Sequence, residues 1–390
     1  MRSKEKYIYR FGNHAADGDD SMRDLLGGKG AGLAEMATLS IPVPPGFTIG
    51  TNACRHYLEQ GALPEGFADE LATAISWLED SVGRKFNDEQ NPLLVSVRSG
   101  AIISMPGMMD TILNVGLTRN GVIGLAKQNG SLRFALDSYR RLLQMMGTIV
   151  FQTHKKEFDA ILDAARTREG VGADSELSEA ALKDIAELFD QAIIRCAKRA
   201  VPQDANKQLL LAIHAVFDSW GNERAKYYRS LHKISDRLGT AVTVQAMVFG
   251  NAGLNSGTGV GFTRNPSTGS PEIFGEFLAN AQGEDIVAGT RTPVPIAALA
   301  NNMPEVYREL SATVRRLEQH YRDVQDFEFT VEKRKLFLLQ TRSAKRSALA
   351  AVRIAVDMVE DGLISRQEAV ARIQPSSITE ILAPQLDLSA

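Results

Sequence analysis

The sequence predicts an α+β fold in which two lobes containing β-strands are separated by an inserted helical subdomain and followed by helices at the C-terminus. Strand-like runs occur near the start of the chain and return at residues 241–249, and a hairpin pattern covers 326–342. Between them, residues 125–237 carry long amphipathic periodicity with few glycines. We place the lobes at 1–120 and 239–345, the helical subdomain at 121–238, and C-terminal helices leading to a linker at 346–390.

Composition excludes several classes of protein. With 390 residues, of which 44% are hydrophobic, the chain is long enough for two or three globular units. A net charge of -3 argues against a broad nucleic-acid surface. Cys54 and Cys196 make neither a disulfide framework nor a cysteine zinc site, which favours a reducing compartment. We find no membrane-spanning run or signal core, so we expect a cytoplasmic protein without membrane or nucleic-acid partners.

The first chemical signal is a glycine-rich turn. After a strand-like run at residues 6–12, residues 25–36 (LLGGKGAGLAEM) are typical of a turn that opens a helix, and Lys29 lies where helix N-terminal amides also point. Lys29 is therefore a candidate phosphate ligand. The segment fits neither the Walker pattern nor G-x-G-x-x-G.

The second signal is a strand that ends in an arginine. Residues 95–97 suit a buried strand, and Arg98 offers a rigid fork of donors to phosphate oxygens. Small residues in the following loop let the backbone pass close to a ligand, and these are Gly100, Ser104 and Gly107. The alternative is a strand, an ordinary surface arginine and a turn at 105–107.

Two further stretches are less specific. In the helical subdomain, one helix face carries Leu182, Ile185, Phe189, Ile193 and Cys196. After the run at 241–249, five glycines between 250 and 261 indicate hairpins, followed by phosphate-capable donors at Thr263 and Arg264. A strand is expected at 272–277, and Pro304 opens a helix.

The hairpin at 326–342 carries a geometric argument. A turn centred on Arg334 pairs Glu328 with Gln340 and Asp326 with Arg342, and the period of two places all four side chains on one face. Two carboxylates suit Mg²⁺, which usually takes one or two protein carboxylates plus phosphate oxygens. Arg342 beside them could hold the same phosphate. An exposed face with a salt bridge is the alternative.

The C-terminal helices have clear boundaries. Residues 348–360 form a helix that closes near Gly362, and Ser365-x-x-Glu368 is a capping box that opens another.

With these residues in view, the chain resembles the N-terminal, nucleotide-binding part of the pyruvate phosphate dikinase family over nearly its whole length. Five motifs carry the resemblance, at 21–36, 95–117, 256–269, 275–293 and 326–346. Phosphoenolpyruvate synthases share the glycine-lysine turn and the Val-Arg-Ser stretch. They do not usually carry the runs at 105–111 and 263–269, which favours the dikinase.

The resemblance implies a fold and a set of ligands. It implies an ATP-grasp-like fold of two lobes that binds ATP and Mg²⁺ and passes the β-phosphoryl group to a histidine of a separate domain. By resemblance Lys29 and Arg98 grip phosphates, the loop through Gly107 is a lid, and Gln245 and Met247 line the adenine pocket. Asp326 and Glu328 hold Mg²⁺, while Gln340 and Arg342 complete the wall.

The sequence also departs from the family pattern. Its six histidines lack the family's phosphohistidine context, and the pyruvate-binding barrel does not occur in these 390 residues. Both partners would act in cis or in trans, and a homodimer is one assembly that the resemblance allows. Alternatives to a dikinase donor half are a related dikinase with another acceptor and an ATP-binding regulatory or assembly module without transfer.

Overall fold

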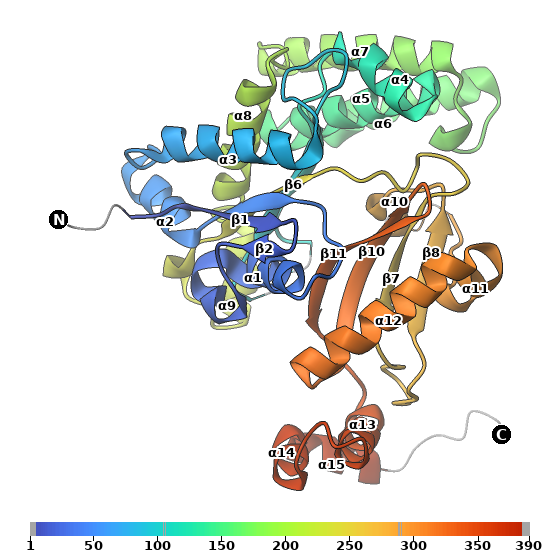
Figure 1. Cartoon of the computed structure of the whole chain (residues 1–390). Coiled ribbons are helices and arrows are strands. Elements are labelled where there is room, and N and C mark those ends of the chain that lie inside the picture. Colours follow the sequence, from blue (N-terminus) through green and yellow to red (C-terminus); the bar gives the residue numbers. More distant parts are fainter. Residues whose placement is uncertain (1–4, 104, 106, 288, 290, 384–390) are drawn as a thin grey trace. The chain divides into compact units, whose positions relative to one another are not determined.

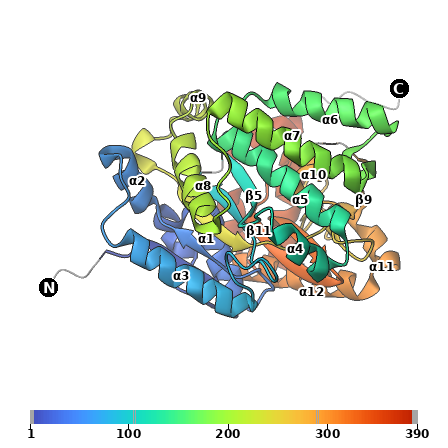
Figure 2. The same cartoon turned by 90° about the horizontal axis from the view of Figure 1, so that it is seen from above.

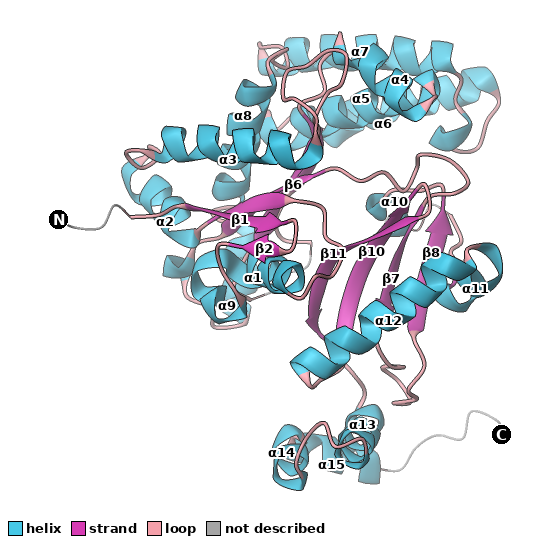
Figure 3. Cartoon of the chain, in the orientation of Figure 1, coloured by secondary structure: helices cyan, strands magenta, loops and turns pink. Residues whose placement is uncertain are grey.

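The computed structural model describes residues 5–383 except 104, 106, 288 and 290. The chain divides into two compact units, Met1–Met247 and Val248–Ala390, and each has its own sheet (Figures 1 and 3). The mixed content of helices and strands confirms the predicted α+β class. In the described part of the chain, no helix is both long enough and apolar enough to cross a membrane.

The sheet of the first unit has six strands in the order β2-β1-β3-β6-β4-β5. Their bounds are β1 Ile8–Gly12, β2 Ala15–Ala16, β3 Gly46–Ile49, β4 Val95–Gly100, β5 Thr111–Val115 and β6 Ala241–Ala246. Every residue of β6 is buried, as expected of a central strand. Our sequence-based division gave residues 239–247 to the second lobe, but β6 pairs with β3 and β4 of the first sheet. A local sequence pattern predicts that a strand is buried, but it does not determine which sheet the strand joins.

The two faces of this sheet differ in chemistry. Alternation along the paired strands puts Phe47, Val97 and Val244 on one face, and Thr48, Arg98 and Thr243 on the other. Helix α1 (Arg23–Thr38) packs on the polar face, where a Cβ on Gly30 would lie only 2.6 Å from the Thr48 side chain. Figure 1 shows α8 (Ala205–Ser219) on the opposite side of the sheet. Glycine at position 30 therefore sets how closely α1 approaches the polar face.

Most of the remaining helices of the first unit lie in residues 121–238, where the sequence predicted a helical subdomain. Helices α2 Thr51–Gln60 and α3 Phe67–Val82 precede β4, and after β5 come α4 Gly121–Asn129, α5 Leu132–Met145, α6 Lys155–Glu169, α7 Glu179–Ala197 and α9 Glu223–Leu231. A π-helical turn, Met146–Val150, extends α5, and 3-10 turns cover Asp20–Met22, Asp174–Glu176 and Asp236–Leu238. Figure 2 shows α5, α6 and α7 running side by side.

Side-chain caps explain where several of these helices begin. Ser131, Ser178, Asp204 and Asn222 accept hydrogen bonds from backbone N–H groups in the first turns of α5, α7, α8 and α9. The predicted apolar face of α7 is buried from Leu182 to Ile193. Cys196, which we placed on that face, is exposed, because α7 ends at Ala197 and its last turn leaves the core.

The second unit is built on a five-stranded sheet in the order β11-β10-β7-β8-β9. Its strands are β7 Gly257–Phe262, β8 Phe274–Ala279, β9 Val294–Pro295, β10 Gln325–Glu332 and β11 Lys335–Ser343. Its helices before the hairpin are α10 Gly283–Val287, α11 Leu299–Asn302 and α12 Pro304–Tyr321, with a 3-10 turn at Ile296–Ala298. Figure 1 shows α12 lying across the sheet.

Glycines make room for aromatic side chains in this sheet. A Cβ on Gly257 would lie 2.1 Å from the Phe277 ring, and one on Gly259 would lie 2.3 Å from the Phe329 ring. Both distances are shorter than any tolerable contact. The sequence suggested hairpins here, whereas residues 257–262 form a strand between β8 and β10.

The hairpin of β10 and β11 has the predicted pairs, Asp326 with Arg342 and Glu328 with Gln340. The turn is a two-residue turn in which Lys333 and Arg334 have φ of 48° and 66°, as a type I′ turn requires. A bulge after Glu328 shifts the register by one residue. The predicted symmetry about Arg334 therefore holds only at the far end of the hairpin.

Three helices, α13 Ala348–Glu360, α14 Arg366–Arg372 and α15 Pro375–Leu382, follow the hairpin. The predicted capping box is present, with Ser365 and Glu368 bonding each other's backbone N–H groups. Their apolar cluster contains Val324, Ile354 and Met358, so α13 packs against the segment that enters β10.

Candidate functional site

Arg98 lies on the polar face of the first sheet, in β4, and is only 8% exposed. Its neighbour on that face is Gln245 of β6, whose side-chain oxygen accepts a hydrogen bond from Arg98 Nη2. Gln245 Nε2 donates to the carbonyl oxygen of Pro44 at 2.8 Å. Arg98 is thus a buried arginine with a fixed neutral acceptor, and not the ordinary surface arginine of the alternative interpretation.

The glycine-rich turn brings Lys29 to the end of the same strand. Gly27 has a φ of 65°, and a Cβ there would lie 1.7 Å from the carbonyl oxygen of Gly100, so only glycine fits. The Gly28 N–H donates to the carbonyl oxygen of Ala101 at 3.1 Å. The Cβ of Lys29 lies 3.6 Å from the position a Cβ on Gly100 would take. The structure therefore places Lys29 beside the end of the strand that carries Arg98.

The loop after β4 is attached at its far end. Asn222 Nδ2 donates to the carbonyl oxygen of Met108 at 3.2 Å, while the Asn222 side-chain oxygen caps α9. Burial raises the pKa of the Asp110 carboxyl, and the charge of Arg224 opposes that rise. Gly107 has a φ of 71° and open space around it. Ser104, the other predicted loop ligand, lies outside the described residues.

Gln245 and Met247, the two residues predicted to line the adenine pocket, have different surroundings in the structure. Met247 is half-buried, and its N–H donates to the carbonyl oxygen of Leu94 at 2.9 Å, which extends the strand pairing beyond β6. Both polar ends of the Gln245 side chain bond to protein atoms. A contact between adenine and either residue stays a prediction.

In the second unit, Asp326, Glu328, Gln340 and Arg342 share one face of the hairpin. Arg342 Nε donates to the Asp326 carboxylate at 2.8 Å. Burial raises the pKa of Asp326, the Glu328 charge adds to that rise, and Arg342 opposes it. Two carboxylates two residues apart suit a cation whose other ligands are phosphate oxygens. No cluster of three or more metal-binding side chains exists within the described ranges.

Thr263 and Arg264 have internal partners. The Thr263 hydroxyl donates to Glu318 at 2.8 Å and accepts from the Gln325 N–H at 3.1 Å. Arg264 is 4% exposed and donates to Glu318 at 2.8 and 2.9 Å, with longer bonds to Asp361 and Asp357. This cluster joins β7, α12 and α13. The proposed contact of Thr263 with a phosphate stays a prediction, and its hydroxyl is already engaged.

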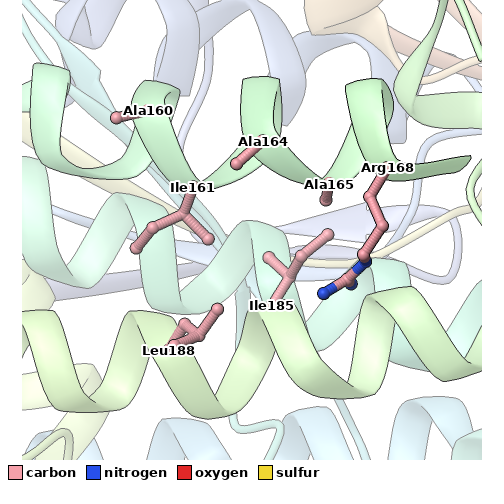
Figure 4. A pocket seen from close by; sticks show the side chains of 7 residues that line it. All are labelled: Ala160, Ile161, Ala164, Ala165, Arg168, Ile185 and Leu188. Carbon is pink, nitrogen blue, oxygen red and sulfur yellow. The ribbon is translucent and has the colours of Figure 1, made fainter. Parts of the chain in front are cut away.

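A hollow of about 360 Å³ lies elsewhere, between α6 and α7 (Figure 4). Its lining residues are Ala160, Ile161, Ala164, Ala165, Arg168, Ile185 and Leu188. Figure 4 shows alanine and aliphatic side chains facing the hollow, with Arg168 at one end. One guanidinium beside apolar groups does not match a polyphosphate ligand, so the hollow is not the candidate site.

Sequence reasoning missed the roles of Gln245 and Asn222. The strand at 241–246 is otherwise made of alanine, valine and threonine, and a buried glutamine in such a run needs hydrogen-bond partners. That signal was available for Gln245. Asn222 gave none, because its contact with Met108 is far away in the sequence.

Comparisons with known proteins agree along nearly the whole chain. The family model "Pyruvate phosphate dikinase, AMP/ATP-binding domain" matches residues 23–71, 63–306 and 302–362. The chain is 50% identical over 388 residues to pyruvate, phosphate dikinase of Clostridium symbiosum, covering 99% of this chain and 44% of that protein. The chain is also 51% identical over 395 residues to pyruvate, phosphate dikinase of Rhizobium meliloti (strain 1021), covering 98% of this chain and 44% of that protein.

A plant relative is similar to this chain to about the same extent. Pyruvate, phosphate dikinase 1, chloroplastic, of Arabidopsis thaliana is 48% identical over 382 residues, covering 98% of this chain and 40% of the relative. The chain spans less than half the length of these relatives. The resemblance drawn from the motifs is confirmed: the chain belongs to the pyruvate phosphate dikinase, AMP/ATP-binding domain family.

Proposed function

We propose that this chain is the nucleotide-binding part of a pyruvate phosphate dikinase that binds Mg-ATP and donates the β-phosphoryl group to a histidine on a separate domain. In that transfer the bond between the α- and β-phosphates breaks and AMP leaves, while the γ-phosphoryl group passes to inorganic phosphate. The observation that supports the proposal is that the glycine turn places Lys29 beside Gly100 of β4, the strand that carries Arg98 two residues earlier, because two cations near one strand end suit a phosphate group. The relatives named as dikinases support the chemistry.

Six of the predicted residues have roles in this proposal. Lys29 supplies a point charge and Arg98 a planar fork to phosphate oxygens. Asp326 and Glu328 would hold Mg²⁺, and the bound ion would neutralise phosphate charge. Arg342 and Gln340 lie beside these carboxylates and present donors to the same phosphates. Phosphoryl transfer depends mostly on positioning and electrostatic stabilisation, which these side chains supply.

The acceptor histidine and the pyruvate-binding barrel would come from elsewhere, in cis or in trans. None of the six histidines of this sequence has the phosphohistidine context. We therefore expect the chain to bind ATP without stable self-phosphorylation.

The test uses ATP labelled at the β-phosphate with Mg²⁺, inorganic phosphate and a separately expressed phosphohistidine domain of a full-length relative. Label should appear on the added domain and be removed by acid, as expected of a phosphoramidate. Tight ATP binding with no label on the added domain would favour the regulatory or assembly module. Acid-labile label on this chain alone, lost on replacing one of its own histidines, would contradict the donor role.

A further inference from the structure

Gln245 joins the candidate phosphate ligand Arg98 to the backbone on the other side of β6. It is 1% exposed, its oxygen accepts from Arg98 Nη2, and its Nε2 donates to the Pro44 carbonyl oxygen at 2.8 Å. A guanidinium can only donate and a carbonyl oxygen can only accept, so the two partners determine which way the amide points.

The strand register explains the contact. Thr243 lies opposite Arg98, and Gln245 lies opposite Ser96, so Gln245 is the diagonal neighbour of Arg98 on the same face. Diagonal neighbours are too far apart for short side chains but within reach of long ones. Pro44 belongs to the connection just before β3, the strand that pairs with β6 on its other side.

We propose that Gln245 is a positioning residue, which fixes the Arg98 guanidinium by anchoring it through the amide to the Pro44 carbonyl. The inference rests on the proposed role of Arg98 in binding phosphate. It gives Gln245 a function other than contact with adenine. A neutral amide orients the guanidinium without cancelling its charge, whereas a carboxylate would compete with the phosphate for the same N–H groups.

The experiment measures ATP and adenosine affinities of Gln245→Met, Arg98→Lys and the double variant. Methionine has similar length and no hydrogen bond, so Gln245→Met should weaken ATP binding roughly tenfold or more, as loss of a hydrogen bond to a charged group does. It should leave adenosine binding within about twofold, because adenosine carries no phosphate. In the Arg98→Lys background, adding Gln245→Met should weaken ATP binding by less than about twofold. Such non-additivity is expected of residues that act together.

Gln208→Met is the matched control. Gln208 is also fully buried in the first unit, accepts from the Gly116 N–H at 2.9 Å and donates to the Pro202 carbonyl oxygen at 2.8 Å. Its replacement should lower the melting temperature as Gln245→Met does, with ATP affinity unchanged. If Gln245→Met does not melt cooperatively, Gln245→Asn, one methylene shorter, is measured in its place with the same expected coupling.

The outcomes separate the inference from the proposed function. Absence of ATP binding by the wild-type chain would contradict the proposed function itself. ATP binding that falls in Arg98→Lys but stays normal in the Gln245 variant would overturn the inference alone. Equal loss in both backgrounds, or a matching loss for adenosine, would overturn it in favour of direct contact with the nucleotide.

Discussion

Two buried arginines in this chain have opposite surroundings. Arg98, in the first unit, donates to the neutral amide of Gln245. Arg264, in the second unit, donates to the carboxylates of Glu318, Asp357 and Asp361. Arg98 lies within β4 and Arg264 lies two residues after the end of β7, and both appeared in the sequence as phosphate-capable donors. An arginine bonded to several carboxylates is held in place by the fold, whereas a neutral amide orients a guanidinium without cancelling its charge.

Removing the guanidinium of Arg264 should have the largest effect on stability. Arg264→Met leaves the half-buried carboxylate of Glu318 without its arginine partner, and we expect a loss of about 3 kcal/mol in the free energy of unfolding. Urea denaturation measures it. ATP affinity of the fraction that stays folded should remain near that of the wild type, and a selective loss of affinity with normal stability would reverse the two roles.

A third arginine, Arg342, offers an intermediate case. Its pair with Asp326 is partly open to solvent, with Arg342 43% exposed. Such pairs contribute little, so Asp326→Asn should change the unfolding free energy by less than about 1 kcal/mol. It should instead reduce the gain in ATP affinity that Mg²⁺ produces, because the variant lacks one of the two proposed carboxylate ligands. Calorimetry with Mg²⁺ and with EDTA checks this, and an undiminished effect of Mg²⁺ would remove Asp326 from the metal site.

The smallest expected effect concerns the reactivity of the two cysteine thiols, both of which lie in the first unit. Burial raises the pKa of Cys54 to about 12, so almost none of it is thiolate at pH 8, while Cys196 is exposed. One thiol should react rapidly with a disulfide reagent, and the second only on unfolding. The same pattern in Arg98→Lys would show that its sheet is intact. Rapid reaction of Cys54 in that variant would mean that Arg98 also stabilises the fold.

Local patterns predicted much of the fold because their causes are local. The helix at 348–360, the capping box at Ser365 and the helix opened by Pro304 follow from residues close in sequence. The hairpin pairs were also predicted, although a bulge and the turn at Lys333 and Arg334 combine to produce them.

The features that the sequence did not predict depend on contacts with residues far away in the sequence. Strand β7 was missed because glycine disfavours strands, and its glycines make sense only beside the rings of Phe277 and Phe329. The sheet that receives β6 depends on its pairing with β3 and β4. In the candidate site, residue type alone could not separate Arg98 from Arg264, since their partners are about 50 to 150 positions away in the sequence.

The most direct test titrates Mg-ATP into three proteins side by side: wild type, Arg98→Lys and Arg264→Lys. A lysine cannot reproduce a planar fork, so Arg98→Lys should weaken binding by roughly tenfold to a hundredfold with a nearly unchanged melting temperature. Arg264→Lys should melt at a lower temperature and, below it, bind ATP as the wild type does. Equal ATP affinity of the wild type and Arg98→Lys would contradict the assignment of Arg98 to the nucleotide phosphates.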